Sequence, residues 1–340
     1  MAMNEVDRMP GLRLQLVGMA IGAMAAVGVW ASAAPQARAD MPKLDIGIST
    51  TWWGHIPIMV AIDKGYFKEL GVDVEVQPIG SSSDRIRAVT AGSVAWSNLG
   101  RIAAISEMSR GNESFYFFAN VDDSPGNEGC WARPGINSLA DLKGKKVAAN
   151  SSAEITLSGL LEGAGMSIKD VDFVNLPGGE MAAAIAKGDV DAACVWEPLF
   201  TAVRDAAPGG TLLGTDKDTV GYKKFGTMAS PDVVIISRKV ADEQPELAGK
   251  LAEAMFKGVA YTNANPEDAA ETVAHYFRKP PEVVLAAIKS FQYFGKDGWE
   301  KHMELHSGQM QYLANWLHAN GKIPSAPDTK KWEKTNFIPK

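Results

Sequence analysis

Side chains that could bind a small solute follow the short β-branched runs of this sequence. Most of them are small, polar or aromatic, and the candidates are Thr51, Trp52, Trp53, His55, Ser81, Ser82, Asn98, Gly100, Ser151, Ser152, Trp196 and Glu197. Hydroxyl groups and the free N–H groups of helix N-termini bind oxyanions, and aromatic faces attract cations. The pattern therefore predicts a site for a small oxyanion beside a cage of aromatic rings.

Several candidates have a second interpretation. Ser151 opens a capping box with Glu154 and Ser81 nearly opens one with Asp84, and capping is the favoured role of both serines. Capping does not exclude ligand contact, because both use the same exposed N–H groups.

The aromatic and charged candidates are also open to two interpretations. Trp52 and Trp53 share one loop, where two indoles rarely both bury, so we expect at least one to contact the ligand. Trp196 follows an apolar run and could belong to the core. Glu197 could be the charge partner of a helix N-terminus or an acid of the site. Arg101 could bind an anion or be solvated.

Catalytic and metal-binding motifs are absent from the sequence. His302 and His306 are four residues apart but lack the Glu of an H-E-x-x-H motif, so surface histidines are favoured over a metal site. There is no G-x-S-x-G elbow, no phosphate-binding loop and no C-x-x-C pair. We expect no enzyme, no cofactor and no bound metal.

The elements that must position these residues alternate between strands and helices. In the first part of the chain the strands are expected at Leu44–Ser49, Val72–Gln77, Val94–Ser97 and Phe115–Val121, and the helices at Ile56–Lys64 and Asp84–Ala91. Turn-forming residues 122–129 then indicate a linker. The series starts again with strands at Lys146–Ala149, Val171–Leu176 and Val190–Val195 and helices at Ser152–Gly163 and Glu180–Lys187. Such alternation is typical of βαβ units on a largely parallel sheet.

The likeness of these two series predicts two doubly wound α/β lobes. A strand at Asp232–Ser237 and a helical tail follow the second series, and the tail is expected to return to the first lobe. Lobe 1 would comprise residues 40–125 and 236–340, and lobe 2 residues 126–235, joined by a two-strand hinge. Ligands of open parallel sheets lie beyond the carboxyl ends of the strands, which places the site in the cleft between the lobes.

The N-terminus has the features of a signal peptide. Arg8 and Arg13 precede an apolar run over residues 14–30, and Ala37-Arg38-Ala39 is a cleavage site, so we expect residues 1–39 to be removed after Ala39. The alternative is a retained membrane anchor. It is disfavoured because the run contains Gln15 and is shorter than the roughly 20 apolar residues of a membrane span.

Charge and cysteine content restrict the partners. The net charge is −6 and no basic stripe is present, which argues against a nucleic-acid partner. Cys130 and Cys194 could pair in an oxidising compartment or remain two buried thiols, and both readings stay open.

Several short motifs in a fixed order give the chain a family resemblance. They are Asn98-Leu99-Gly100, Lys145-Lys146-Val147-Ala148, Val195-Trp196-Glu197-Pro198, Ser230-Pro231-Asp232-Val233-Val234, Arg238-Lys239 and Asn320-Gly321-Lys322-Ile323-Pro324. From about Leu44 to Ile338 the chain resembles the substrate-binding proteins of nitrate/sulfonate/taurine ABC importers, and it is most similar to the taurine-binding branch.

The resemblance implies a periplasmic type II solute-binding fold, a periplasmic location, a monomer, and permease and ATPase partners. It also implies that Asp232 binds an ammonium group beside Trp196, while the serine runs and residues 98–100 bind a sulfonate. The first loop and the Glu197–Pro198 pair depart from the taurine branch, so we expect taurine, another aminosulfonate or a related zwitterion. The alternatives are an alkyl- or arylsulfonate, and a desulfinase that would use Cys194.

Overall fold

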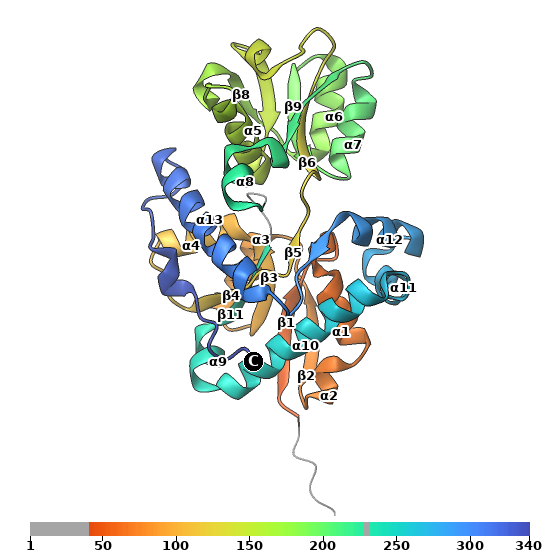
Figure 1. Ribbon diagram of the computed structural model, residues 1–340, viewed down its shortest axis with the longest axis vertical. Helices are drawn as coiled ribbons and strands as arrows, with labels where there is room; N and C mark the ends of the chain where they lie inside the picture. Colours follow the sequence, from red (N-terminus) through yellow and green to blue (C-terminus); the bar gives the residue numbers. More distant parts are fainter. Residues whose placement is uncertain (1–40, 228–231) are drawn as a thin grey trace, which may run out of the picture. The chain divides into compact units, whose positions relative to one another are not determined.

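The computed structural model describes residues 41–227 and 232–340, and Met41–Lys340 forms one compact unit (Figure 1). The expected signal peptide, residues 1–39, lies outside the described residues. No described helix is both long enough and apolar enough to cross a bilayer.

The first sheet combines three parallel strands with two strands that close its other edge. Its order is β2 (Asp73–Pro78), β1 (Lys43–Ile48), β3 (Trp96–Gly100), β11 (Asp232–Ser237) and β4 (Phe115–Ala119). Strand β1 pairs in parallel with β2 and β3, whereas β11 pairs antiparallel with β3 and β4. The expected boundary at residue 235 is wrong, because β11 lies entirely in the first sheet and would be cut by it.

The second sheet repeats this order with other strands. It runs β8 (Asp172–Asn175), β7 (Lys146–Ala149), β9 (Ala192–Trp196), β6 (Glu128–Ala132) and β10 (Thr211–Thr215). Strand β7 is parallel to β8 and β9, and β6 is antiparallel to β9 and β10. The mixed α/β architecture expected from the sequence is confirmed.

Helices cover both sheets. Those around the first sheet are α1 (Ile56–Asp63), α2 (Tyr66–Glu69), α3 (Ser82–Thr90), α4 (Arg101–Ser109), α9 (Arg238–Glu243), α10 (Pro245–Ala264), α11 (Pro266–Phe277), α12 (Pro281–Ser290) and α13 (Trp299–Ala319). Those around the second sheet are α5 (Ser151–Gly163), α6 (Gly178–Lys187), α7 (Leu199–Ala206) and α8 (Val220–Phe225) (Figure 1). The helical tail after β11 thus packs on the first sheet, as expected.

Strand β11 shows why the first sheet is buried on both faces. Val234 and Ile236 join the core beneath α1 and α10, and Val233 and Ile235 join the core beneath α4 and α13. Side chains alternate between the faces of a strand, and a strand covered on both sides is apolar throughout. The continuous Val-Val-Ile-Ile run follows from that burial.

The segment expected as a linker is partly a strand. Asp122–Asp123 forms β5 and pairs antiparallel with β12 (Gln292–Tyr293), and β6 begins at Glu128. Only residues 124–127 of this segment form a turn, in which the Asn127 N–H donates to the Ser124 carbonyl oxygen at 3.0 Å. The partner strand comes from the helical tail, so no local pattern could reveal this pairing. Residues 228–231 lie outside the described residues.

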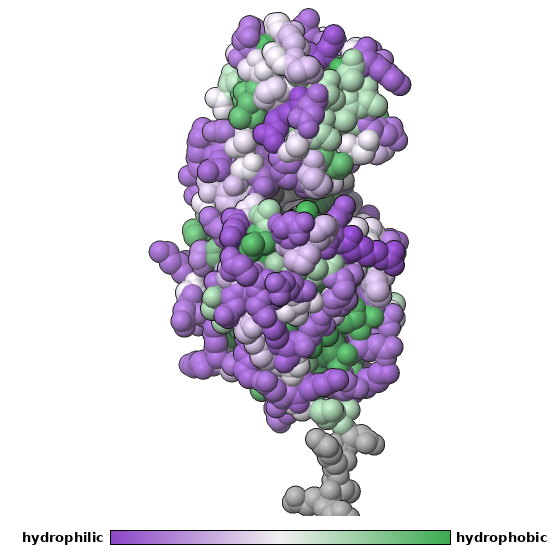
Figure 2. All heavy atoms as spheres, turned by 90° about the vertical axis from the view of Figure 1, so that its right-hand side faces the viewer, coloured by the Kyte–Doolittle hydropathy of each residue, from purple (hydrophilic) through white to green (hydrophobic). Residues whose placement is uncertain are grey.

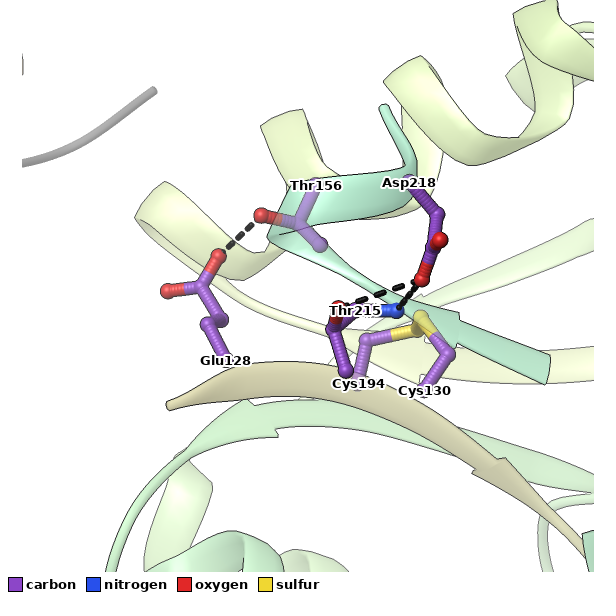
Figure 3. Close-up of a disulfide and its surroundings, with 6 residues drawn as sticks. All are labelled: Glu128, Cys130, Thr156, Cys194, Thr215 and Asp218. Carbon is purple, nitrogen blue, oxygen red and sulfur yellow. Dashed lines mark hydrogen bonds between the residues drawn. A yellow bond between two sulfur atoms is a disulfide. The ribbon is translucent and has the colours of Figure 1, made fainter. Parts of the chain in front are cut away.

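The two cysteines form a disulfide bond. Cys130 of β6 and Cys194 of β9 are directly opposite each other, with Cα atoms 4.0 Å apart (Figure 3). Both are fully buried. The pairing left open by the sequence is therefore decided by strand register, and neither sulfur is a free thiol.

Candidate functional site

A polar cavity of about 230 Å³ lies where the strand ends of the two sheets face each other. Its walls come from both sheets and comprise Ser49, Thr51, Trp52, Gly80, Ser82, Arg85, Gly100, Glu128, Trp196 and Asp232. The sequence-predicted candidates Thr51, Trp52, Ser82, Gly100, Trp196 and Asp232 are brought together here. Ser49, Arg85 and Glu128 were not predicted.

Asp232 supplies a buried carboxylate to this cavity. It is 5% exposed and opens β11 opposite Gly100, the last residue of β3. Its Oδ2 lies 3.4 Å from His55 Nε2 and accepts no hydrogen bond within the described part of the chain. A buried carboxylate oxygen with one distant donor favours a ligand that brings a closer one.

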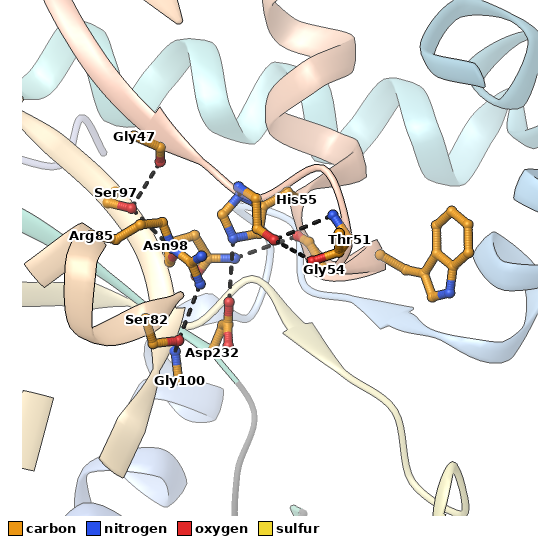
Figure 4. Close-up of polar contacts among 12 residues, drawn as sticks. Gly47, Thr51, Gly54, His55, Ser82, Arg85, Ser97, Asn98, Gly100 and Asp232 are labelled. Carbon is orange, nitrogen blue, oxygen red and sulfur yellow. Dashed lines mark hydrogen bonds and ion pairs between the residues drawn. The ribbon is translucent and has the colours of Figure 1, made fainter. Parts of the chain in front are cut away.

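His55 contacts Asp232 and does not line the cavity (Figure 4). The geometry therefore gives no support to the prediction that His55 contacts the ligand directly. The Ser49 N–H donates to His55 Nδ1 at 3.1 Å. Burial lowers the pKa of His55, against the opposing effect of Asp232. A neutral ring whose Nδ1 accepts must carry its proton on Nε2, which faces Asp232.

Arg85 connects the loops that form one wall of the cavity. Its guanidinium donates to the carbonyl oxygens of Asn98, Ile79 and Gly80 at 2.9 Å each, and to Ser82 Oγ at 3.1 Å (Figure 4). It is 3% exposed, and burial lowers its pKa. No sequence pattern indicated this role, because one Arg on an amphipathic helix is normally solvated.

Of the candidates Ser81, Ser82 and Asn98, only Ser82 lines the cavity. Ser82 lines the cavity and accepts the Gly100 N–H at 3.1 Å. Ser81 is the exposed N-cap of α3 and accepts the Asp84 N–H at 3.1 Å, as the capping interpretation predicted. Asn98 is buried, and its Nδ2 donates to the Gly54 carbonyl at 3.4 Å. Neither Ser81 nor Asn98 lines the cavity.

The second serine pair is described only in its backbone. Helix α5 begins at Ser151 and its N-cap is Asn150, which corrects the expected cap at Ser151. The side chains of Ser151 and Ser152 lie outside the described part of the structure.

Glu128 adds a second carboxylate from the opposite sheet. It is 2% exposed, accepts a hydrogen bond from Thr156 Oγ1 and opens β6 opposite Trp196 (Figure 3). The sequence missed it because the residue fell in the presumed linker. The cavity thus contains two acids, one guanidinium and three hydroxyl side chains.

The loop that contains Trp52 and Gly54 packs closely against another buried acid, Asp122. A Cβ on Gly54 would lie 1.7 Å from Asp122 Oδ2 and 2.5 Å from Trp52 Nε1, so only glycine fits. Burial, Asp232 and Asp123 raise the pKa of Asp122 well above its usual value, and the Trp52 indole N–H opposes the shift. The close approach fixes Trp52 at the edge of the cavity.

A second, mainly apolar cavity of about 320 Å³ adjoins the first. It is lined by Trp52, Trp53, Ser124, Asn127, Glu128, Trp196, Glu197, Pro198, Val283, Ala286, Ala287, Ser290 and Phe291. Figure 2 shows the face that carries α12, where the surface is hollowed between the regions of the two sheets. Trp52, Trp53 and Trp196 all line this cavity, and their contact with a ligand stays a prediction.

Glu197 lines the second cavity while capping its own helix. Its carboxylate accepts the Thr201 N–H at 3.0 Å and lies 3.1 Å from Arg204 Nη2. Of the two roles considered for this residue, the helix N-terminal partner is therefore observed.

Arg101 and the paired histidines lie away from both cavities. Arg101 is fully buried and contacts Gln309 and His306 of α13, and burial lowers its pKa to about 9. His306 is 1% exposed, so the prediction of a surface histidine was wrong for this residue. It is buried because α13 packs against α4. Within residues 41–227 and 232–340, no group of three potential metal ligands occurs.

Comparisons with known proteins agree with the architecture. The model of the NMT1/THI5-like family matches residues 52–269. A candidate binding protein of Brucella abortus is 25% identical over 306 residues, which cover 89% of this chain and 93% of that protein. The taurine-binding periplasmic protein of Escherichia coli is 28% identical over 209 residues, or 60% of this chain and 62% of that protein.

A solved structure has the same fold. The periplasmic aliphatic sulphonate binding protein SsuA from Escherichia coli superposes with a TM-score of 0.70 at 19% identity, over 85% of this chain and 91% of that one. This likeness establishes the periplasmic-binding-protein fold for the chain.

Proposed function

The chain belongs to the NMT1/THI5-like family, and we propose that it is the periplasmic solute-binding component of an ABC importer for an aminosulfonate such as taurine or a related zwitterion. The names of its taurine- and sulfonate-binding relatives support this class of protein. The signal peptide expected at residues 1–39 would export it, and a permease and its ATPase would be the partners.

The observation that carries the proposal is the buried oxygen of Asp232. The residue lines the polar cavity, and the His55 ring nitrogen Nε2, 3.4 Å from its Oδ2, is the nearest donor to that oxygen among the described residues. A ligand ammonium placed there would also lie near Glu128 and the indoles of Trp52 and Trp196. When the ligand ammonium is buried beside a carboxylate of opposite charge, neither charge is left unpaired.

The anionic end would bind to hydroxyl groups that line the same cavity. Ser49, Thr51 and Ser82 provide hydroxyl groups there. Arg85 lies behind Ser82 and adds positive charge close to those hydroxyls. These groups suit a sulfonate, whose oxygens accept hydrogen bonds but do not donate them.

Binding would be coupled to closure of the cavity. Asp232 and Ser82 come from the first-sheet region, whereas Glu128 and Trp196 come from the second. A ligand that contacts both sides stabilises the arrangement in which they meet. That closed form would dock on the permease.

The test compares two ligands that differ only in the amine. Isothermal titration calorimetry of the wild type and Asp232→Asn would use taurine and ethanesulfonate. We expect Asp232→Asn to weaken taurine about 100-fold, or about 2.7 kcal/mol, and ethanesulfonate less than about threefold. Equal losses for both ligands would rule out the ammonium role of Asp232.

Two alternative functions give different results in the same assay. An alkyl- or arylsulfonate binder is favoured by the apolar cavity, and it would bind ethanesulfonate at least as tightly as taurine. A desulfinase would release sulfite from a sulfonate or sulfinate. Cys194 cannot be its thiol nucleophile while bonded to Cys130.

A further inference from the structure

The polar and the apolar cavities are continuous. Trp52, Glu128 and Trp196 line both of them. A ligand whose charged head lies against Asp232 could therefore extend past the two indoles without crossing a wall of backbone.

The polar cavity is the smaller of the two and, taken alone, is smaller than most small-molecule pockets. Its volume of about 230 Å³ is below the range of roughly 300–1,000 Å³ typical of small-molecule pockets. With the adjoining cavity of about 320 Å³ the site falls within that range. Taurine alone would leave the second cavity to water.

The second cavity is suited to an apolar group. Of its polar side chains, Glu197 is engaged by Thr201 and Arg204, and Asn127 donates to the Ser290 carbonyl at 3.0 Å. The rest of the wall is mainly aromatic and aliphatic. Filling such a surface with an apolar group removes it from water, which is favourable.

The arrangement of the rings favours an aromatic group in particular. Trp52 and Phe291 pack edge to face with centroids 5.3 Å apart, and Trp53 and Trp196 form further wall. Flat rings gain from edge-to-face and offset contacts with such walls beyond simple burial. Val283 and Ala286 of α12 are exposed and leave the entrance open.

From these observations we infer that the ligand is an aminosulfonate with an aromatic substituent on or near its amine, and that the substituent occupies the cavity between Trp52, Trp196 and α12. This inference rests on the proposed function, because it places the charged head in the polar cavity. It specifies the substrate class of that site more narrowly than taurine.

The experiment compares taurine with N-benzyltaurine by calorimetry. Both have a sulfonate and a protonated amine, and N-benzyltaurine has a benzyl group in place of one ammonium hydrogen of taurine. We expect the wild type to bind N-benzyltaurine at least tenfold more tightly, which corresponds to about 1.4 kcal/mol. N-cyclohexyltaurine, with a saturated ring of similar size, should fall between the two.

A variant on α12 tests where the ring lies. Ala286→Trp places an indole in the second cavity and should reduce the affinity ratio of the two ligands to about one. Lys289→Trp places the same side chain at an exposed position of α12 outside the lining residues, and it should keep the wild-type ratio. A loss of fold would weaken both ligands together and leave the ratio unchanged, so circular dichroism of each variant completes the comparison.

The outcomes separate this inference from the proposed function. If taurine binds and N-benzyltaurine binds no more tightly, the aromatic substituent is wrong and the aminosulfonate function stands. A preference that survives Ala286→Trp would place the ring elsewhere and overturn the inference. If neither ligand binds, both proposals fail together.

Discussion

The two sheets share one strand order but present different chemistry at their ends. In each, the central antiparallel strand begins with a buried acid opposite the last residue of a neighbouring strand. In the first sheet Asp232 stands opposite Gly100, and in the second Glu128 stands opposite Trp196. Glycine leaves space beside one acid, whereas an indole covers the other. The same backbone plan thus yields an open polar half and an aromatic half.

The groups that contact Asp232 and Glu128 also differ. Asp232 is backed by a neutral His55, whose Nε2 lies 3.4 Å away. The backbone N–H of Glu128 donates instead to another carboxylate, Asp216 Oδ1, at 3.3 Å. The second sheet carries a covalent link between β6 and β9, while the corresponding β11–β3 pair has only hydrogen bonds. We expect the second sheet to depend more on redox state and pH.

The largest expected effect is on the stability of the disulfide-linked sheet. The double variant Cys130→Ala/Cys194→Ala should lower the free energy of unfolding by about 4 kcal/mol, because the bond closes a loop of 64 residues in the unfolded chain. Urea unfolding followed by circular dichroism measures the change. An unaltered urea midpoint would show that the bond does not stabilise the second sheet.

The next effect is a pH dependence of stability that originates at Asp216. Burial and the neighbouring Glu128 raise the pKa of Asp216 to about 7, although N–H groups of Gly126 and Glu128 oppose the shift. The folded state therefore holds this proton more tightly than the unfolded state, and stability should fall as pH rises from about 4 to 7.

Each pKa unit corresponds to about 1.4 kcal/mol, so the expected loss over that interval is roughly 2–4 kcal/mol. Asp216→Asn should reduce this slope in urea unfolding measured at several pH values. Asp205→Asn, at an exposed position of α7, controls for the loss of one charge. Parallel slopes for the wild type and Asp216→Asn would contradict the assignment.

The smallest effect concerns the acid of the aromatic half. Glu128→Gln should weaken taurine about tenfold, less than the loss expected for Asp232→Asn, because Thr156 already donates to the Glu128 carboxylate. Calorimetry with taurine measures both variants. A greater loss for Glu128→Gln would reverse the assignment and make the second sheet the main cation site.

Local sequence determined the elements and part of the site. The periodicity of apolar residues located most strands and helices within a few residues, because each element must bury one face or both. Ser81 was correctly interpreted as a cap from three residues of context. Trp52, Trp53, Trp196 and Ser82, which line the two cavities, were chosen as candidates because they follow strands, and the ends of parallel strands meet at one edge of a sheet.

Only the tertiary structure decided which charges are buried together. Arg85, Arg101, Glu128 and His306 look like surface residues in the sequence, yet each is at most 3% exposed. Arg101 contacts residues of α13 that are more than 200 residues away in the sequence, and Glu128 contacts Thr156 of α5. The disulfide depends likewise on the register of β6 and β9. Burial of charge depends on which distant groups compensate for lost hydration, and a local pattern does not contain that information.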